Sequence, residues 1–296
     1  MLQETLLLVD GTGVAYRAFY AIARLSTKAG QPTNAVFGFI KMLLQMDAQW
    51  KPAACVVVFD GGLPAERMAR LPTYKAQRKE IPDDLRSQFA MMEEFLACAG
   101  ILSLRVEGEE ADDVIATLAD RGVREGRRVL IASSDKDLFQ LVTDGVEMIG
   151  PQKAAEKMDA AAVHAKTGVW PQQIVDWLAL TGDSSDNIPG VPGVGPKTAA
   201  KLLADYGSVD GLWQRLSEVE SDRIRDLLVA HRDAVERNLE LVRLRKDIPL
   251  QVTWSDLQRK QVPAARLISF YESMEFASLA KGLRESEELR RNPELF

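Results

Sequence analysis

The stretch Thr181–Thr198, which reads TGDSSDNIPGVPGVGPKT, holds two kinds of signal side by side. Its first half places the carboxylates of Asp183 and Asp186 three residues apart. Its second half is a Gly/Pro turn that leads into a helix, because Pro196 suits the first position of a helix, where no backbone N–H is needed. The free N–H groups and the positive dipole end of a first helical turn attract anions. An acidic site is therefore predicted next to a phosphate-binding turn.

Two nucleotide-binding motifs are only partly present. Gly190 and Gly195 have the spacing of a P-loop, but Pro196 stands where that motif needs Lys. Gly11-x-Gly13 resembles the start of a dinucleotide fingerprint, but Tyr16 occupies the place of the third glycine. A turn that only reverses the chain is the remaining alternative for the stretch 181–198.

Buried strands are predicted where short apolar runs alternate with helical patterns. The runs are 6–9, 55–59, 101–106 and 129–132, and the helical patterns are 13–24, 34–49 and 114–121. This alternation predicts a parallel sheet, in which ligands bind beyond the carboxyl ends of the strands. The first run ends in Asp10, the second ends in Asp60, and the fourth leads to Asp135 and Asp137. These acids should therefore meet at one edge of the sheet.

A further group of acids precedes the helical pattern 114–121, within the sequence EEADD at residues 109–113. Acids in a first helical turn complement the helix dipole, which is the simpler interpretation. Four acids in five residues exceed what this requires. We therefore expect nine carboxylates at one site. They are Asp10, Asp60, Glu110, Asp112, Asp113, Asp135, Asp137, Asp183 and Asp186.

Nine carboxylates at one site would repel one another unless cations neutralise them. Two unit charges 4 Å apart repel by about 4 kcal/mol at an effective dielectric of ~20. A ligand set of oxygens without His or Cys favours Mg²⁺ or Mn²⁺ over Zn²⁺. Two or more such ions, roughly 4 Å apart, would clamp the attacking and leaving oxygens of a phosphodiester. The acids therefore predict a two-metal hydrolase of phosphodiesters.

The composition restricts the class of protein. The 296 residues carry a net charge of −6, yet without the nine acids 34 acidic residues would stand against 37 basic ones. Basic patches can thus surround an acidic centre. Cys55 and Cys98 lie in apolar settings, which predicts reduced core thiols of a cytoplasmic protein. No run approaches the ~20 apolar residues of a membrane span, and His164 and His231 are too isolated for a His-based metal site.

A basic segment separates the second strand from the next helix. It contains Arg67, Arg70, Tyr74, Lys75, Arg78 and Lys79. Few of its residues suit a core, so we expect an exposed helical excursion over about residues 62–86. Such an excursion could contact phosphates and stack a base on Tyr74. A solvated helix face without a function is the alternative.

Together these motifs resemble the 5′-nuclease family, which includes flap endonucleases and the N-terminal 5′→3′ exonuclease domain of bacterial DNA polymerase I. The resemblance covers about residues 5–280. LVDG, VVFD, EADD, DKD and GDSSDN match the acidic set of the family, and no acid is missing. The resemblance implies that Lys75 and Arg78 are catalytic residues at the scissile phosphate and that Tyr74 stacks an unpaired base.

The resemblance also implies contacts to duplex DNA and an architecture. Residues expected to hold the duplex, with a K⁺ ion in their turn, are Gly190, Gly193, Gly195, Lys197 and Thr198. The expected fold class is α/β, with a parallel-sheet, PIN-like nuclease core at 1–158 that includes the helical arch. A C-terminal all-helical helix–three-turn–helix region at 159–283 and a charged tail at 284–296 should follow. Because no polymerase domain follows residue 296, a stand-alone nuclease or an excised domain is expected.

The implied function is a structure-specific 5′→3′ exonuclease and 5′-flap endonuclease. It would cut DNA and RNA primers near single-strand/duplex junctions in replication and repair. Its partners would be DNA with 5′ flaps or 5′ ends, RNA/DNA hybrids and a DNA polymerase, while the chain would be a monomer without membrane contact. A non-catalytic DNA-junction binder of the same fold is the main alternative. An RNA-directed nuclease on a related PIN-like fold predicts fewer acids and no duplex-binding turn.

Overall fold

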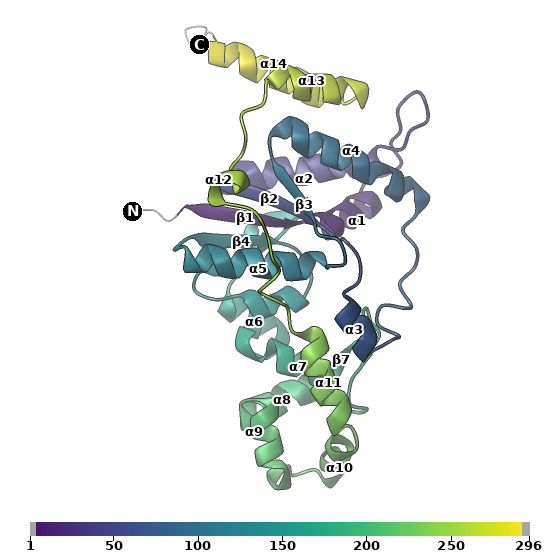
Figure 1. The fold of residues 1–296 in the computed structure, drawn as a ribbon, viewed down its shortest axis with the longest axis vertical. Coiled ribbons are helices and arrows are strands. Elements are labelled where there is room, and N and C mark those ends of the chain that lie inside the picture. The colour runs from purple at the N-terminus through teal and green to yellow at the C-terminus, as the bar shows by residue number, and fades with distance from the viewer. Residues whose placement is uncertain (1–3, 292–296) are drawn as a thin grey trace.

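A six-stranded sheet forms the centre of the computed structural model, which describes residues 4–291 apart from the side chains of 154 and 291 (Figure 1). The strands are β1 (Thr5–Asp10), β2 (Ala54–Phe59), β3 (Leu102–Arg105), β4 (Arg128–Ala132), β5 (Val146–Gly150) and β6 (Lys153–Met158). Their order is β3-β2-β1-β4-β5-β6; β1 to β5 run parallel, and β6 pairs antiparallel with β5. The chain proceeds from β1 through β2 to β3 on one side and then crosses to β4 on the other side of β1, so a topological switch point lies at the carboxyl ends of β1 and β4.

Helices cover both faces of this sheet. They are α1 (Gly11–Ala21), α2 (Asn34–Trp50), α4 (Asp83–Ala99) and α5 (Ala111–Arg124), whereas α3 (Ala65–Arg70) lies away from the sheet (Figure 1). Leu8 and Val56 pack with α5 on one face, whereas Leu7 and Val57 pack with α1, α2 and α4 on the other. The apolar runs have no polar alternation because both of their faces are buried, as is typical of parallel strands.

After β6 the chain is mainly helical. Its helices are α6 (Ala160–Thr167), α7 (Ile174–Thr181), α8 (Pro196–Tyr206), α9 (Val209–Gln214), α10 (Asp222–Ala230), α11 (Arg232–Val242), α12 (Trp254–Leu257), α13 (Ala264–Ser273) and α14 (Ala277–Arg291). The strands β7 (Gly182–Asp183) and β8 (Ile188–Pro189) form a hairpin between α7 and α8. Two 3-10 turns lie at Pro171–Gln173 and Leu216–Glu218. A further 3-10 turn, η1 (Asp137–Leu141), follows β4. Helices α7 to α11 gather at the end of the molecule that is lowest in Figure 1.

The last two helices pack on the α4 side of the α/β half and not with the other C-terminal helices, which differs from the expected boundaries. The rings of Phe270 and Tyr271 on α13 lie 6.1 and 6.3 Å from that of Phe95 on α4. Helices α13 and α14 thus lie at the opposite end of the molecule from α8 to α10 (Figure 1). Residues 284–291 continue α14 instead of starting a separate tail, while 292–296 lie outside the described residues. The cause is an apolar helix face that burial against α4 stabilises.

The basic segment also differs from the expected helical excursion. It contains only the short helix α3, after which the chain runs through turns until α4 begins at Asp83. Tyr74, Lys75 and Arg67 are buried, although the segment was expected to be exposed. Its side chains pack onto the acidic residues described below, and these supply the partners that a buried charge requires.

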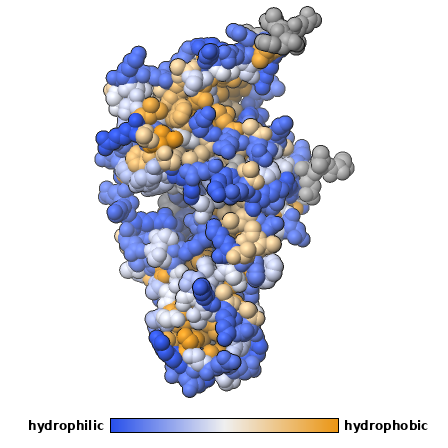
Figure 2. Space-filling model, turned by 180° about the vertical axis from the view of Figure 1, so that it is seen from behind, coloured by the Kyte–Doolittle hydropathy of each residue, from blue (hydrophilic) through white to orange (hydrophobic). Residues whose placement is uncertain are grey.

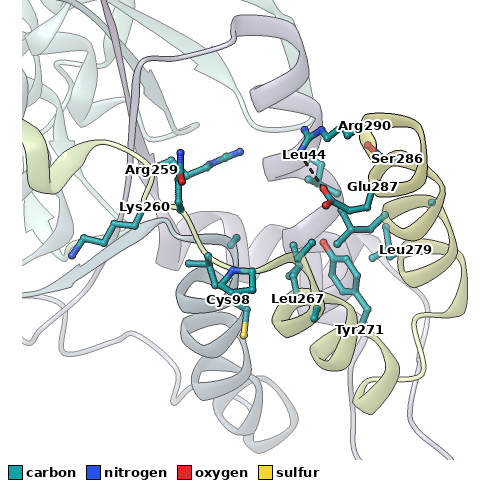
Figure 3. A pocket seen from close by; sticks show the side chains of 18 of the residues that line it. Leu44, Cys98, Arg259, Lys260, Leu267, Tyr271, Leu279, Ser286, Glu287 and Arg290 are labelled. Carbon is teal, nitrogen blue, oxygen red and sulfur yellow. Dashed lines mark hydrogen bonds and ion pairs between the residues drawn. The ribbon is translucent and has the colours of Figure 1, made fainter. Parts of the chain in front are cut away.

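A cavity of about 990 Å³ lies between the helices α13 and α14 and the segment 259–265 (Figure 3). Leu267, Tyr271 and Leu279 form part of its apolar wall, and an ion pair of 3.1 Å joins Glu287 to Arg290 at its rim. None of the nine predicted acids, all of which the structure describes, lines this cavity. It is therefore separate from the acidic centre.

The face opposite to that of Figure 1 is largely polar (Figure 2). Apolar side chains gather on it over the half that holds the sheet and again near the tip of the helical end. Exposed large apolar residues include Tyr20, Leu44 and Val229. Within residues 4–291, no helix combines the length and the apolar character that a bilayer span needs.

Candidate metal centre and nucleic-acid interface

Asp10 lies at the carboxyl end of the central strand β1. One of its carboxylate oxygens accepts the backbone N–H of Gly13 at 2.7 Å and so caps α1, and the other accepts the hydroxyl of Ser133 at 2.8 Å. Burial raises the pKa of Asp10 to about 6 against the effect of these hydrogen bonds, and the charges of Asp60 and Asp135 add to the rise. The fold therefore holds this carboxylate firmly but disfavours its ionised form when no cation is bound.

The raised pKa of Asp10 predicts how stability depends on pH. Because the folded-state pKa exceeds the ordinary value of 3.8, the contribution to stability is complete below pH ~4 and is lost as the pH rises through ~6. In EDTA, Asp10→Asn should be more stable than the wild type by roughly 1–3 kcal/mol at pH 7, and this gain should shrink towards pH 4. Urea unfolding across this pH range measures both. A gain that does not change with pH would contradict the assignment.

Asp60 and Asp112 extend the acidic edge towards α5. Asp60 follows β2, and its carboxylate accepts the backbone N–H of Ala111 at 2.9 Å. This bond ties the end of β2 to the start of α5, whose first turn carries Asp112. Burial raises the pKa of Asp112 well above its usual range, and the charges of Asp135 and Asp10 raise it further. Acids from four separate segments thus repel one another at this edge.

A second acidic group joins η1 to the β7–β8 hairpin. One carboxylate oxygen from each of Asp137, Asp183 and Asp186 lies within 4.8 Å of the other two. Asp137 Oδ1 is buried and has no hydrogen-bond partner among the described residues. Burial raises the pKa of Asp137 well above its usual range, followed by the charges of Asp135, Asp183 and Asp186. A buried acceptor without a donor, beside two more carboxylates, fits a divalent cation.

Asp183 differs from Asp137 because donors surround it. Its Oδ1 accepts the backbone N–H of Ser185 at 2.8 Å and the Ser185 hydroxyl at 2.5 Å. Burial alone would raise the pKa of Asp183, but these bonds and the charge of Lys136 lower it below its usual value. Asp183 is therefore an anion at neutral pH, and it can act as a ligand without losing a proton.

The basic segment closes over the acids. The Lys75 ammonium pairs with Glu110 and lies 3.4 Å from Asp186, whose other oxygen is 2.7 Å from Arg78. The Tyr74 hydroxyl donates to Glu110 at 3.0 Å or Asp186 at 3.2 Å, and Tyr74 is only 3% exposed. In this conformation Tyr74 cannot offer its ring to an unpaired base, contrary to the expectation, because its hydroxyl and ring are both engaged in the core.

Backbone contacts fix the same segment to the hairpin. The N–H of Lys75 donates to the carbonyl of Asp186 at 2.9 Å, and the amide of Asn187 donates to the carbonyl of Thr73 at 2.7 Å. Lys75 and Asn187 both have positive φ, 54° and 57°. Such φ values are uncommon outside glycine and persist where surrounding contacts hold them.

Arg67 also belongs to this centre, although the sequence predicted that it would be exposed. It is 6% exposed. Its guanidinium bonds both oxygens of Asp113 at 2.6 and 2.9 Å, also bonds Glu110, and donates to the carbonyls of Leu241 and Arg243 at 3.0 and 3.1 Å. Asp113 is therefore the counterion of Arg67, which speaks against its expected role as a metal ligand. No sequence signal distinguished Arg67 from its basic neighbours.

The turn before α8 has the backbone geometry expected from its glycines. Gly193 has a φ of 80°, and a Cβ on Gly190 would lie 2.2 Å from the carbonyl of Thr181. Helix α8 begins at Pro196, and no side chain caps its N-terminus at Gly195. Exposed Lys197 and half-buried Thr198 follow in the first turn. The exposed N-terminal end of this helix has the free backbone N–H groups and the dipole that a phosphate can use.

Gly190 and Gly195 offer a matched test of this turn. We expect Gly190→Ala to lower the free energy of unfolding by about 1–3 kcal/mol, because the new methyl group would overlap the backbone of the preceding helix. Gly195→Ala should change it by less than about 0.5 kcal/mol, since its Cβ would meet no atom within 4 Å. Urea unfolding of both variants measures the difference; equal values would contradict this geometry.

Comparison with known proteins identifies the family. Residues 5–168 match the model of the 5′-3′ exonuclease N-terminal resolvase-like domain, and residues 169–276 match that of the 5′-3′ exonuclease C-terminal SAM fold. The chain belongs to the 5′-3′ exonuclease family. The resemblance inferred from the motifs is thereby confirmed.

Members of this family include both short and long proteins. The 5′-3′ exonuclease of Aquifex aeolicus is 40% identical over 278 residues, which are 94% of each chain. The thermostable DNA polymerase I of Thermus filiformis is 42% identical over 279 residues, which are 93% of this chain and 33% of the polymerase. The chain thus spans about a third of the length of the polymerase relatives that it matches.

Solved structures of related fold confirm the predicted fold class. The bacteriophage T5 flap endonuclease, in a pseudo-enzyme-product complex with DNA and metal ions, has a TM-score of 0.66 at 23% identity over 95% of this chain and 98% of that one. The catalytic core of Rad2, in complex with DNA substrate, has a TM-score of 0.61 at 17% identity over 97% and 92%. Both share the α/β sheet with a helical C-terminal region.

The structure separates the nine predicted acids into groups. One group is close enough for its charges to raise one another's pKa values, and it consists of Asp10, Asp60, Asp112 and Asp135. The charge of Asp135 also raises the pKa of Asp137, which belongs to the cluster with Asp183 and Asp186. Glu110 and Asp113 instead face basic side chains. Sequence reasoning did not single out Ser133, Ser185 or Lys136, although each lies within two residues of a predicted acid and makes contact with one.

Proposed function

We propose that this chain is a divalent-metal-dependent 5′ nuclease that hydrolyses phosphodiesters of DNA and RNA primers near single-strand/duplex junctions. The Asp137–Asp183–Asp186 cluster carries the proposal, because the buried Oδ1 of Asp137, which has no hydrogen-bond partner among the described residues, and two neighbouring carboxylates fit the ligand set of a divalent cation. The same hairpin that carries Asp183 and Asp186 leads directly into the turn before α8. A metal centre and a phosphate-binding helix end are thus joined by a few residues, as a structure-specific nuclease needs. Replication and repair are the processes in which such junctions arise.

Two ions, Mg²⁺ or Mn²⁺, are proposed, and the clustering of Asp137, Asp183 and Asp186 supports the first. Asp137, Asp183 and Asp186 would hold one ion, and a second would lie at the edge formed by the remaining unpaired acids. These acids are Asp10, Asp60, Asp112 and Asp135. When bound, such ions supply a water of lowered pKa and charge stabilisation for the leaving oxygen. The role of the fold is to hold the carboxylates in place through partners such as Ser133 and Ser185.

Lys75 and Arg78 are proposed as the residues that contact the scissile phosphate. Burial alone would lower the pKa of Lys75, but Glu110 and Asp186 raise it, so Lys75 is a cation. Its ion pairs lie at the same acids that would surround the phosphate. Exchange of a carboxylate partner for a phosphate oxygen would keep the charge of Lys75 compensated throughout binding. Tyr74 would stack a base only after its ring leaves the core.

Duplex DNA is proposed to bind along the turn and the first residues of α8. Gly190, Gly193 and Gly195 would bring the backbone close to a phosphate, and Lys197 and Thr198 would contact it. A K⁺ ion in the turn would bridge carbonyl groups to the DNA backbone. Recognition of this kind reads shape and phosphates more than bases.

The partners and location are proposed on wider grounds. The polymerase relatives carry this region within longer chains, which supports a functional link to a DNA polymerase. Substrates would be 5′ flaps, 5′ ends and RNA/DNA hybrids, bound by a monomer. Cys55 and Cys98 are buried and free, which supports a reducing, cytoplasmic environment.

Cleavage of an end-labelled double-flap DNA tests this function. We expect cutting near the base of the 5′ flap with Mg²⁺ or Mn²⁺, none in EDTA, and slower cutting of the matched single strand. Binding of the junction without product in either metal would instead support a non-catalytic junction binder of this fold.

A further inference from the structure

Lys136 has no role in the function proposed above. It lies between Asp135 and Asp137 and directly precedes η1. Its ammonium nitrogen is 3.4 Å from Asp183 Oδ2, and 39% of its side chain is exposed. The lysine thus reaches into the acidic cluster from the strand edge while part of it remains in solvent.

The two hairpin acids obtain their basic partners from different places. Asp186 pairs with Lys75 and Arg78, which belong to the basic segment between β2 and α4. Among residues 4–291, Asp183 forms an ion pair only with Lys136. Lys136 is anchored by the end of β4 on one side and by η1 on the other. Its ammonium group can therefore move away from the cluster only if the side chain rotates into solvent.

An ammonium group at this position competes with a metal ion. Asp183 is one of the three residues whose oxygens lie within 4.8 Å of one another. A divalent ion held by that cluster would repel the Lys136 ammonium, since both are cations that use the same carboxylate. Metal binding then has to displace the lysine, and this requirement weakens the apparent affinity for the ion.

We propose that Lys136 is an internal counterion that competes with the divalent ion for Asp183 and so sets the metal affinity of the Asp137–Asp183–Asp186 cluster. In the metal-free protein the lysine limits repulsion among the acids. In the metal-bound protein its ammonium turns towards solvent at the mouth of the acidic edge. The inference rests on the metal cluster of the proposed function. It adds a role for Lys136, a positioning residue that the proposed function does not need.

Mn²⁺ titration of the DNA-free protein, followed by calorimetry and by the EPR signal of free Mn²⁺, tests the proposal. We expect Lys136→Met to bind Mn²⁺ about tenfold more tightly than the wild type at low ionic strength. Lys136→Arg, which keeps the charge, should stay close to the wild type. Lys28→Met is the matched control, because this exposed lysine lies in the loop between α1 and α2 and its loss should leave the affinity unchanged.

Thermal unfolding separates this role from a merely structural one. In EDTA, Lys136→Met should unfold about 2–4 °C below the wild type, because the acids lose a counterion. In saturating Mn²⁺ this deficit should disappear, since the ion replaces the lost charge. An equal deficit in both conditions would show that Lys136 only supports the fold.

The outcomes distinguish this inference from the proposed function. If the wild type binds Mn²⁺ and Lys136→Met binds it with equal or lower affinity, the counterion role is wrong while the metal centre stands. If neither protein binds Mn²⁺, the metal centre and the counterion role are both wrong.

Discussion

Asp137→Asn should reduce Mg²⁺-dependent flap cleavage by a factor of about 10³ or more. The substitution removes the charge of the carboxylate whose Oδ1 is buried without a hydrogen-bond partner among the described residues. The amide keeps the size of the side chain, so the loss should reflect metal binding and not a rearranged fold. Single-turnover cleavage of a labelled double-flap DNA measures the rate.

Two comparisons make this expectation specific. Asp144→Asn removes an exposed acid from the turn before β5 and should leave the rate unchanged. Affinity of Asp137→Asn for flap DNA in EDTA should stay equal or increase, because one negative charge near the phosphates is lost. Full cleavage by Asp137→Asn would show that Asp137 is not part of the catalytic centre.

Arg67→Met should lower the free energy of unfolding by about 3–5 kcal/mol. The variant leaves the buried carboxylate of Asp113 without the guanidinium that bonds both of its oxygens. It also breaks the link from α3 to the carbonyls of Leu241 and Arg243 at the end of α11. A buried charge without a partner is far more costly than the loss of a surface ion pair.

Arg70 provides the control for Arg67 on the same short helix. Its ion pair with Glu240 is 2.8 Å long, but both side chains are about half exposed. Arg70→Met should therefore change stability by about 0–1 kcal/mol. Urea unfolding in EDTA compares the two variants. A loss below 1 kcal/mol for Arg67→Met would show that the buried cluster does not stabilise the fold.

Local sequence signals were sufficient for much of the fold and for the acidic set. Apolar runs without polar alternation predicted the strands β1, β2 and β4, and Pro196 predicted the first residue of α8. The acids after these strands could be placed at one edge because parallel strands share a direction. Hydrophobic periodicity and the Gly and Pro residues of turns and helix starts act over a few residues, so a sequence shows them directly.

Pairings between distant segments were not accessible in the same way. Arg67 and Arg70 look alike in the sequence, yet one is buried against Asp113 and the other is on the surface. Tyr74 is buried, and its hydroxyl bonds to Glu110 or Asp186, which lie far from it in the sequence. Helix α13 packs on α4 because aromatic rings more than 170 residues apart in sequence come together. These outcomes depend on tertiary contacts that no local pattern specifies.

Anomalous diffraction from a crystal soaked in Mn²⁺ would locate the ions of the metal centre without relying on activity. We expect one anomalous peak among Asp137, Asp183 and Asp186 and a second beside Asp10 and Asp135. A fully occupied Mn²⁺ elsewhere on the protein, with no peak at this edge of the sheet, would contradict the assignment of the acids as a metal centre.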